Sequence, residues 1–157
     1  MSHIEKVGMV ITNLEAFEAA CKQLGIEFHK GQKSFVAYNV GQCDHAVHFP
    51  GLRYELGLVG APLPNGKTGY EPKLDYFSDG LEIQHKLCKK LDTPIYHSVS
   101  HADPKYSVDF EHLKKAYAIE VLKGQAVKNG YKNPIFTQLP DGKTVMKVSK
   151  GDLSQYE

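Results

Sequence analysis

The fold of this chain is decided by residues 1–25, MSHIEKVGMVITNLEAFEAACKQLG. Val7, Met9 and Ile11 recur at every second position, the period of a half-buried strand. Thr12 is a helix-capping residue, and Glu15 can reach back to complete a capping box. Apolar residues then recur on one helical face before the terminating glycine, namely Leu14, Phe17, Cys21 and Leu24 before Gly25. The sequence therefore predicts a strand that leads directly into an amphipathic helix.

Three extended segments follow, at residues 35–38, 45–49 and 54–59, with turn residues between them, so an antiparallel meander is expected. In the third segment Leu56 and Leu58 share one face, whereas Glu55 lies on the other. Such alternation is typical of a sheet with one side on helices and the other facing solvent or a partner. The glycine- and proline-rich residues 60–69 predict a projecting loop.

The second half of the chain predicts a strand, two helices and a hairpin. Residues 70–77 read as a strand, in which Pro72 indicates an edge or a bulge. A short helix is expected at 81–90, a loop at 92–107, and a long helix from an Asp109 cap to Asn129-Gly130. The turn LPDGK at 139–143 predicts a hairpin. We therefore expect one α+β domain over residues 1–157, with a mostly antiparallel sheet of five to seven strands, two or three helices packed on one face, and an inserted loop region at about 82–107.

Composition excludes several classes of protein. The 157 residues are 41% hydrophobic, which is enough to build one core without disulfide bonds or a structural metal, and the net charge is +1. Positive charge is tilted toward the C-terminal half, with 12 basic and 9 acidic residues from Glu82 onward. This balance disfavours nucleic-acid binding but allows a local basic patch. Three separate cysteines, no signal peptide and no long apolar run favour a cytoplasmic protein that does not enter a membrane.

Several segments together resemble a known family. They are MSH at 1–3, the helix at 12–25, CDHA at 43–46, YELGLV at 54–59, residues 70–76, and KAYA at 115–118 in a helix ending at Asn129-Gly130. In this order they resemble the Ycf-thirty-five-like family, a domain of unknown function in cyanobacterial and plastid genomes and in bacteriophages. The resemblance spans nearly the whole chain except residues 82–107. It carries no catalytic residue, and this chain departs from it at Tyr76-Phe77-Ser78, where tryptophan-rich aromatics are expected.

Candidate catalytic and metal-binding groups are weakly patterned. Cys43, His45 and His48 are zinc-ligand types, but on a strand His48 points away from the other two. His97 and His101 lie in a predicted loop. There is no phosphate-binding glycine loop and no nucleophile elbow, and acids such as Glu55 and Asp75 read as solvated surface residues. We therefore expect no catalytic residue, no metal and no cofactor, and we favour binding over catalysis.

Tyrosines interleaved with lysines and histidines provide flat apolar surfaces beside cations, which suit an anionic aromatic ligand. The expected ligand-binding residues are Lys67, Tyr70, Tyr76, Tyr96, His97, His101, Lys105 and Tyr106. For any single one of these residues the favoured interpretation is a core residue or a solubilising charge.

Three hypotheses follow. The first is a non-enzymatic binding protein for a small anionic or nucleotide-derived ligand, at a pocket shared between protomers of a homo-oligomer, with a phage or host accessory role by association. The second is a protein-interaction adaptor that uses an exposed sheet face or edge and the inserted loop. The third is a metal-dependent hydrolase.

Overall fold

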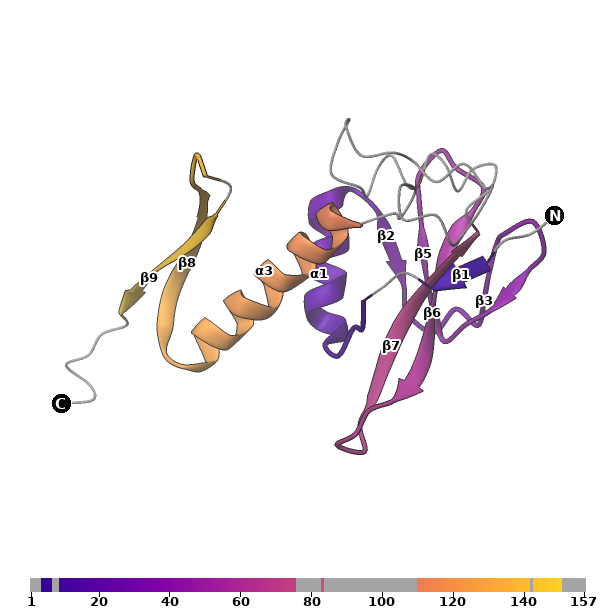
Figure 1. Cartoon of the computed structure of the whole chain (residues 1–157), viewed down its shortest axis with the longest axis horizontal. Helices are drawn as coiled ribbons and strands as arrows, with labels where there is room; N and C mark the ends of the chain where they lie inside the picture. The colour runs from indigo at the N-terminus through magenta and orange to yellow at the C-terminus, as the bar shows by residue number, and fades with distance from the viewer. Residues whose placement is uncertain (1–3, 7–8, 76–82, 84–109, 142, 151–157) are drawn as a thin grey trace.

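A computed structural model describes residues 4–6, 9–75, 83, 110–141 and 143–150 of the chain (Figure 1). The predicted loop at 92–107 and the Asp109 cap lie outside these residues. So does the predicted helix at 81–90, except for Ile83, whose side chain is fully buried in the core.

The main sheet contains five antiparallel strands in the order β1-β7-β6-β5-β2. β6 and β7 form a long central pair of eight residues each, whereas each edge strand has only three residues (Figure 1). The strands are β1 Ile4–Lys6, β2 Glu27–His29, β5 His45–His48, β6 Glu55–Pro62 and β7 Thr68–Asp75.

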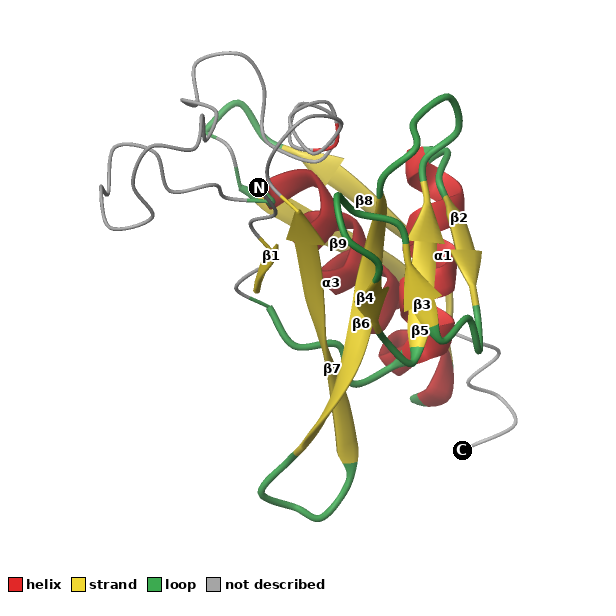
Figure 2. Ribbon diagram, turned by 90° about the vertical axis from the view of Figure 1, so that its right-hand side faces the viewer, coloured by secondary structure: helices red, strands yellow, loops and turns green. Residues whose placement is uncertain are grey.

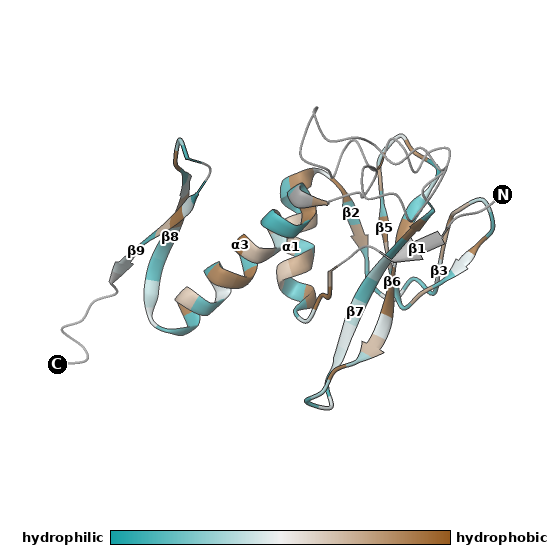
Figure 3. Cartoon of the chain, in the orientation of Figure 1, coloured by the Kyte–Doolittle hydropathy of each residue, from teal (hydrophilic) through white to brown (hydrophobic). Residues whose placement is uncertain are grey.

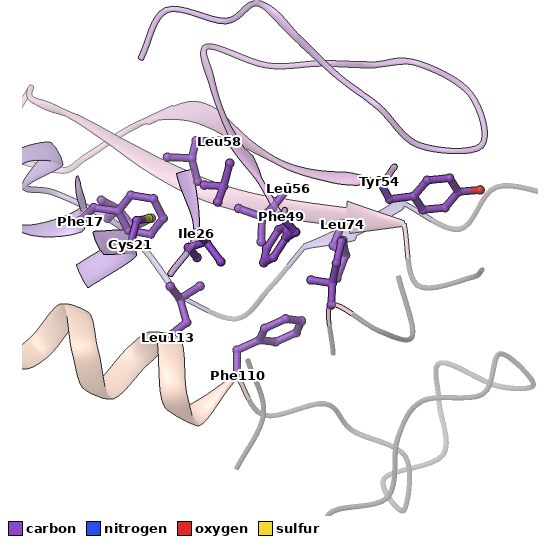
Figure 4. Close-up of a cluster of buried hydrophobic side chains, with 13 residues drawn as sticks. Phe17, Cys21, Ile26, Phe49, Tyr54, Leu56, Leu58, Leu74, Phe110 and Leu113 are labelled. Carbon is purple, nitrogen blue, oxygen red and sulfur yellow. The ribbon is translucent and has the colours of Figure 1, made fainter. Parts of the chain in front are cut away.

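Two helices, α1 (Leu14–Leu24) and α3 (Glu111–Lys128), cover one face of this sheet (Figure 2). The core lies between them and the sheet. Phe110 and Leu113, at the start of α3, point toward the sheet residues Leu56 and Leu74 (Figure 4), and all four side chains are almost fully buried. The first turns of α3 are therefore held by the core.

The helix predicted at 14–24 is confirmed, but its cap lies one residue later than expected. Asn13 is the N-cap, and its side-chain oxygen accepts a hydrogen bond of 3.0 Å from the backbone amide of Ala16. The backbone amide of Thr12 instead donates to the Tyr117 hydroxyl at 2.9 Å. Gly25 ends the helix at φ 71°, a left-handed conformation in which glycine carries no steric penalty.

The sequence predicted that the face of the sheet opposite the helices meets solvent or a partner, but another part of the chain lies over this outer face. It is covered by residues 33–43, which include β3 (Ser34–Phe35) and β4 (Gly41–Gln42). The Phe35 ring lies so close to Gly41 and Gly57 that a Cβ at either glycine would approach it within 2.4 Å. A second small core, of Phe35, Ala37, Cys43 and Ala46, fills this interface.

The C-terminal hairpin of β8 (Tyr131–Gln138) and β9 (Thr144–Lys150) forms a separate two-stranded sheet. The predicted turn is confirmed, because the Leu139 amide donates to the Lys143 carbonyl at 2.7 Å. The hairpin packs against α3 and lies at the end of the molecule farthest from the main sheet (Figure 1).

The α+β class with antiparallel strands is confirmed. The described strands are divided among three sheets, and the largest has five strands only when the three-residue β1 is counted. The projecting loop is also shorter than predicted, because β6 runs to Pro62 and β7 begins at Thr68. Pro72 lies in β7, between the residues that pair with β1 and Tyr70, which forms an isolated bridge to Ile11. No strand pairs with Pro72 on the β1 side, so its missing amide costs no hydrogen bond there.

Candidate functional site

Only two of the eight predicted ligand-binding residues lie in the described part of the chain. Lys67 is exposed in the β6–β7 turn, where its backbone amide donates to the Asn65 side chain at 3.0 Å. Tyr70 is half-buried in β7, and its ring meets His45 edge to face, with 5.0 Å between ring centroids. The other six, Tyr76, Tyr96, His97, His101, Lys105 and Tyr106, lie outside the described residues.

Tyr70 belongs to a row of aromatic contacts on the helix side of the sheet. His45 also contacts Phe28 at 5.7 Å between centroids, and Phe28 contacts Phe17 at 5.6 Å. Because these partners are core residues, the row stabilises the packing of β7, β5 and β2 against α1. No described contact joins the Lys67 side chain to this row, so a ligand site that includes both Lys67 and Tyr70 stays a prediction.

The zinc-ligand types at 43–48 are not gathered together. His45 lies on the core face, where its Nδ1 accepts a hydrogen bond of 2.8 Å from the Gly31 amide. Cys43 lies in the small core of the opposite face, where its thiol donates to the Gln32 carbonyl. His48 is on that outer face too, with its ring stacked on His29. In the described residues, no group of three or more histidine, cysteine or acidic residues could hold a metal ion.

The described cysteines are poor nucleophiles. Burial, followed by the charge of Glu18, raises the pKa of Cys21 to about 12. Burial, followed by the charges of Asp44 and Glu55, raises the pKa of Cys43 to about 11. Because the thiolate is the reactive form, both side chains stay protonated and unreactive near neutral pH.

A polar network occupies the outer face beside the edge strand β2. Gln32 lies at its centre and donates to Glu55 Oε1 at 3.0 Å and to the Ser34 carbonyl at 2.7 Å, while its own oxygen is 3.0 Å from His29 Nδ1. His48 lies between two carboxylates, 3.6 Å from Glu55 and 3.9 Å from Glu27. The donors and acceptors of this network therefore satisfy one another, as in a polar network with a structural role.

Two carboxylates that read as solvated acids in the sequence are in fact buried. Glu55 is 6% exposed and Asp75 is fully buried. Glu55 accepts the Val36 amide at 3.0 Å, and Asp75 accepts the Tyr38 amide at 3.1 Å. These two hydrogen bonds fasten residues 33–43, the covering segment, to the sheet, and each gives a buried carboxylate a donor. The earlier surface interpretation of these acids was wrong.

The strongest candidate surface lies at the other end of the molecule. We define the C-terminal arm as α3 and the β8–β9 hairpin, residues 111–150. The arm contains eight lysines and three acidic residues, whereas the rest of the chain has 11 basic and 15 acidic residues, from totals of 19 and 18. The two parts of the chain therefore carry charge of opposite sign.

Apolar and polar residues are mixed along the arm (Figure 3), and several of its apolar side chains are exposed. Ile135 is 61% exposed and Val145 is 36% exposed, and both lie on the same face of the hairpin, because Val145 pairs with Thr137 and Lys147 pairs with Ile135. Leu139 and Met146 are also exposed. The hairpin and the C-terminal tilt of charge are visible in the sequence, but no binding role was predicted for these residues.

The edges of the hairpin differ from those of the main sheet. Within the described residues, β8 and β9 pair only with each other, so each has one open edge. The edge of β8 is interrupted by Pro134 and by a register shift between Lys132 and Ile135. β9 has seven residues without proline or glycine, and the register shift in its pairing with β8 places the extra residue in β8. An uninterrupted open edge of this length is a template for an additional strand.

No family model, curated protein or solved structure matches this chain. The resemblance to the Ycf-thirty-five-like family therefore stays a prediction from the residues quoted above. Neither described helix is both long and apolar enough to cross a membrane.

Proposed function

We propose that this chain is a non-enzymatic adaptor that binds another protein through its C-terminal arm. The observation that carries the proposal is the open seven-residue edge of β9 on a hairpin that projects from the body. Both edges of the main sheet are strands of three residues, a common way to block unwanted pairing. Only the hairpin presents a long edge within the described chain.

The exposed side chains of the arm support a protein partner. An isolated two-stranded hairpin is marginally stable in water, and burial of its apolar residues in a complex would stabilise it. The phosphates of a nucleic acid would attract the lysines, but a nucleic acid would offer little apolar surface to Ile135, Val145 and Met146. The arm therefore fits a protein better than a nucleic acid.

The site chemistry also supports binding over catalysis. His45, Cys43 and the buried Asp75 hydrogen-bond to backbone groups of the fold. A cytoplasmic location and a phage or host accessory role stay parts of this proposal, the first because Cys21 and Cys43 are buried free thiols.

Site-specific photocrosslinking tests the proposal. A photoreactive amino acid is placed at Val145 in the full chain, expressed in its own host, and the matched control carries it at Val40, which is 66% exposed on the covering segment. We expect one crosslinked protein from position 145 and none from position 40, and a stoichiometric complex when the two purified proteins are mixed.

Two measurements distinguish the other hypotheses. Saturable heat on titration with a nucleotide panel, without a protein complex, would favour the small-ligand hypothesis. Bound zinc or manganese in elemental analysis, with turnover lost on chelation, would favour the metal-dependent hydrolase. Failure to form any complex through position 145 would contradict the adaptor proposal.

A further inference from the structure

We infer that the partner contributes an extended segment rich in acidic residues, which pairs with β9 as a third strand of the hairpin sheet. This inference rests on the proposed function and specifies the chemistry of the partner. It combines two independent features of the arm, its open edge and its charge.

The position of the added strand follows from the two hairpin edges. β8 packs against α3, and Pro134 removes one amide from its backbone. Asn133 beside it has a positive φ of 52°, within the register shift of β8. Proline and bulges are devices that prevent strand addition. β9 has neither, so regular backbone pairing is available only along β9.

The charge of the added strand follows from the lysines of the arm. Lys147 lies in β9 and has no ion-pair partner among the described residues. Lys143, just before β9, is 4.0 Å from Asp141, and both side chains are more than half exposed. Carboxylates on an added strand would lie beside these ammonium groups and would gain from the net positive charge of the arm.

The side-chain pattern of β9 also constrains the segment. Val145 and Lys147 share the face that carries Ile135, whereas Met146 shares the face of Phe136, as the pairing of Phe136 with Met146 shows. Neighbouring strands place side chains beside one another on each face. A segment that fits β9 therefore has an apolar residue beside Val145 and, two positions further along the segment, an acidic residue beside Lys147.

A second copy of this chain fits the β9 edge less well. Pairing of β9 with its own symmetry mate would bring two arms together, each with eight lysines and three acidic residues. Like charges across paired strands are destabilising. The same charges favour an acidic strand from a different protein.

The probe is a seven-residue peptide, the length of β9, with valine at its first and fifth positions, glutamate at its third and seventh, and threonine between them, so that valine and glutamate alternate along one face. A matched peptide has lysine in place of glutamate, and a short DNA duplex is the nucleic-acid control. Binding to the 157-residue, 17.5 kDa chain is followed by the amide signals in NMR spectra and by fluorescence anisotropy. We expect the glutamate peptide to shift the β9 amides, with an affinity that falls between about 0.05 M and 0.3 M salt as charges are screened.

Charge-reversal variants supply the decisive comparison. Lys143→Glu/Lys147→Glu should weaken the glutamate peptide roughly fivefold to tenfold, because each exposed ion pair contributes up to about 1 kcal/mol and 1.4 kcal/mol is a factor of ten. The control Lys22→Glu/Lys30→Glu makes the same charge change at exposed positions on the body and should leave the affinity unchanged.

The outcomes separate this inference from the proposed function. Equal binding of the lysine peptide, preferential binding of DNA, or shifts that miss β9 would overturn the acidic-strand inference. A dimer in light scattering whose β9 amides are already protected would overturn it too. If photocrosslinking still yields a stoichiometric partner in any of these cases, the adaptor function stands and only the acidic strand fails.

Discussion

The packing of Phe35 between two glycines makes Gly57→Ala the most informative test of the fold. A methyl group at position 57 would lie 2.2 Å from Cδ1 and 2.5 Å from Cε1 of the Phe35 ring. Carbon atoms pack at about 3.5–4.0 Å, so the ring would have to move by more than about 1 Å. The ring has little room to move toward Gly41, because it already lies so close to that residue that a Cβ there would be 2.3 Å from it.

The cost should be that of overpacking a core, about 1–3 kcal/mol in the free energy of unfolding. The matched control is Gly124→Ala in α3, where a Cβ meets nothing within 4 Å. Alanine is the better helix former by about 0.8–1.0 kcal/mol, so this variant should be stabilised. The same chemical change therefore has opposite expected signs at the two positions.

Urea unfolding followed by circular dichroism measures both free energies, with the slope checked for two-state behaviour. Phe35→Leu in the Gly57→Ala background should recover part of the loss, giving a coupling energy above about 0.5 kcal/mol in the double-mutant cycle. A Gly57→Ala variant within about 0.5 kcal/mol of the wild type would refute the reasoning, because the covering segment would then not press on the sheet.

Three further predictions concern titration, anchoring and reactivity. Burial holds the pKa of His45 below its ordinary 6.5 in the folded protein, so the unfolded chain binds the proton first, and the free energy of unfolding should fall as the pH drops below about 6.5. His45→Gln should flatten this fall in urea titrations between about pH 7 and pH 5, and an unchanged slope would contradict it. Tyr117→Phe removes the acceptor of two backbone amides before α1, at 2.9 and 3.1 Å, and should cost about 1 kcal/mol at this solvent-accessible site; a chemical melt superimposable on the wild type would speak against this anchor. Cys21 and Cys43 should resist a maleimide reagent at neutral pH until urea unfolds the chain, and rapid native labelling mapped to either peptide would disprove their burial.

Local signals in the sequence were sufficient for α1 and for the turn of the C-terminal hairpin, but the strand expected to lead directly into α1 was misplaced, because β1 is Ile4–Lys6 and Ile11 makes only an isolated bridge to Tyr70. The apolar face of α1 and its glycine terminator were predicted correctly, and so was the turn at Leu139 that forms the hairpin. The cap of α1 was misplaced by one residue, because Thr12 and Asn13 are both capping residues and a contact with Tyr117 in a distant helix engages Thr12.

The outer face could not be predicted, because it depends on contacts between segments distant in sequence. Glu55 alternates with leucines, as a solvated residue of a two-faced strand does, yet the backbone of residues 34–38 lies over it. Gly57 carried no signal that Phe35 would fill the space above it.

The candidate surface was partly visible in the sequence. The excess of lysine in the C-terminal half and the hairpin were both found, but a sequence does not show which strands have neighbours. The open edge of β9 required the sheet topology, and Pro134 acquires its protective role only once β8 is known to be the other edge strand. Most residues of the predicted ligand site lie outside the described chain, and that hypothesis stays a prediction.

Hydrogen exchange along β9, measured on the full chain alone and in complex with its crosslinked partner protein, tests the central claim most directly. The arm should exchange its outward β9 amides rapidly when alone and become protected in the complex, while β6 and β7 remain unchanged. Protection of β9 in the free protein, or no change on complex formation, would contradict strand addition at the C-terminal arm.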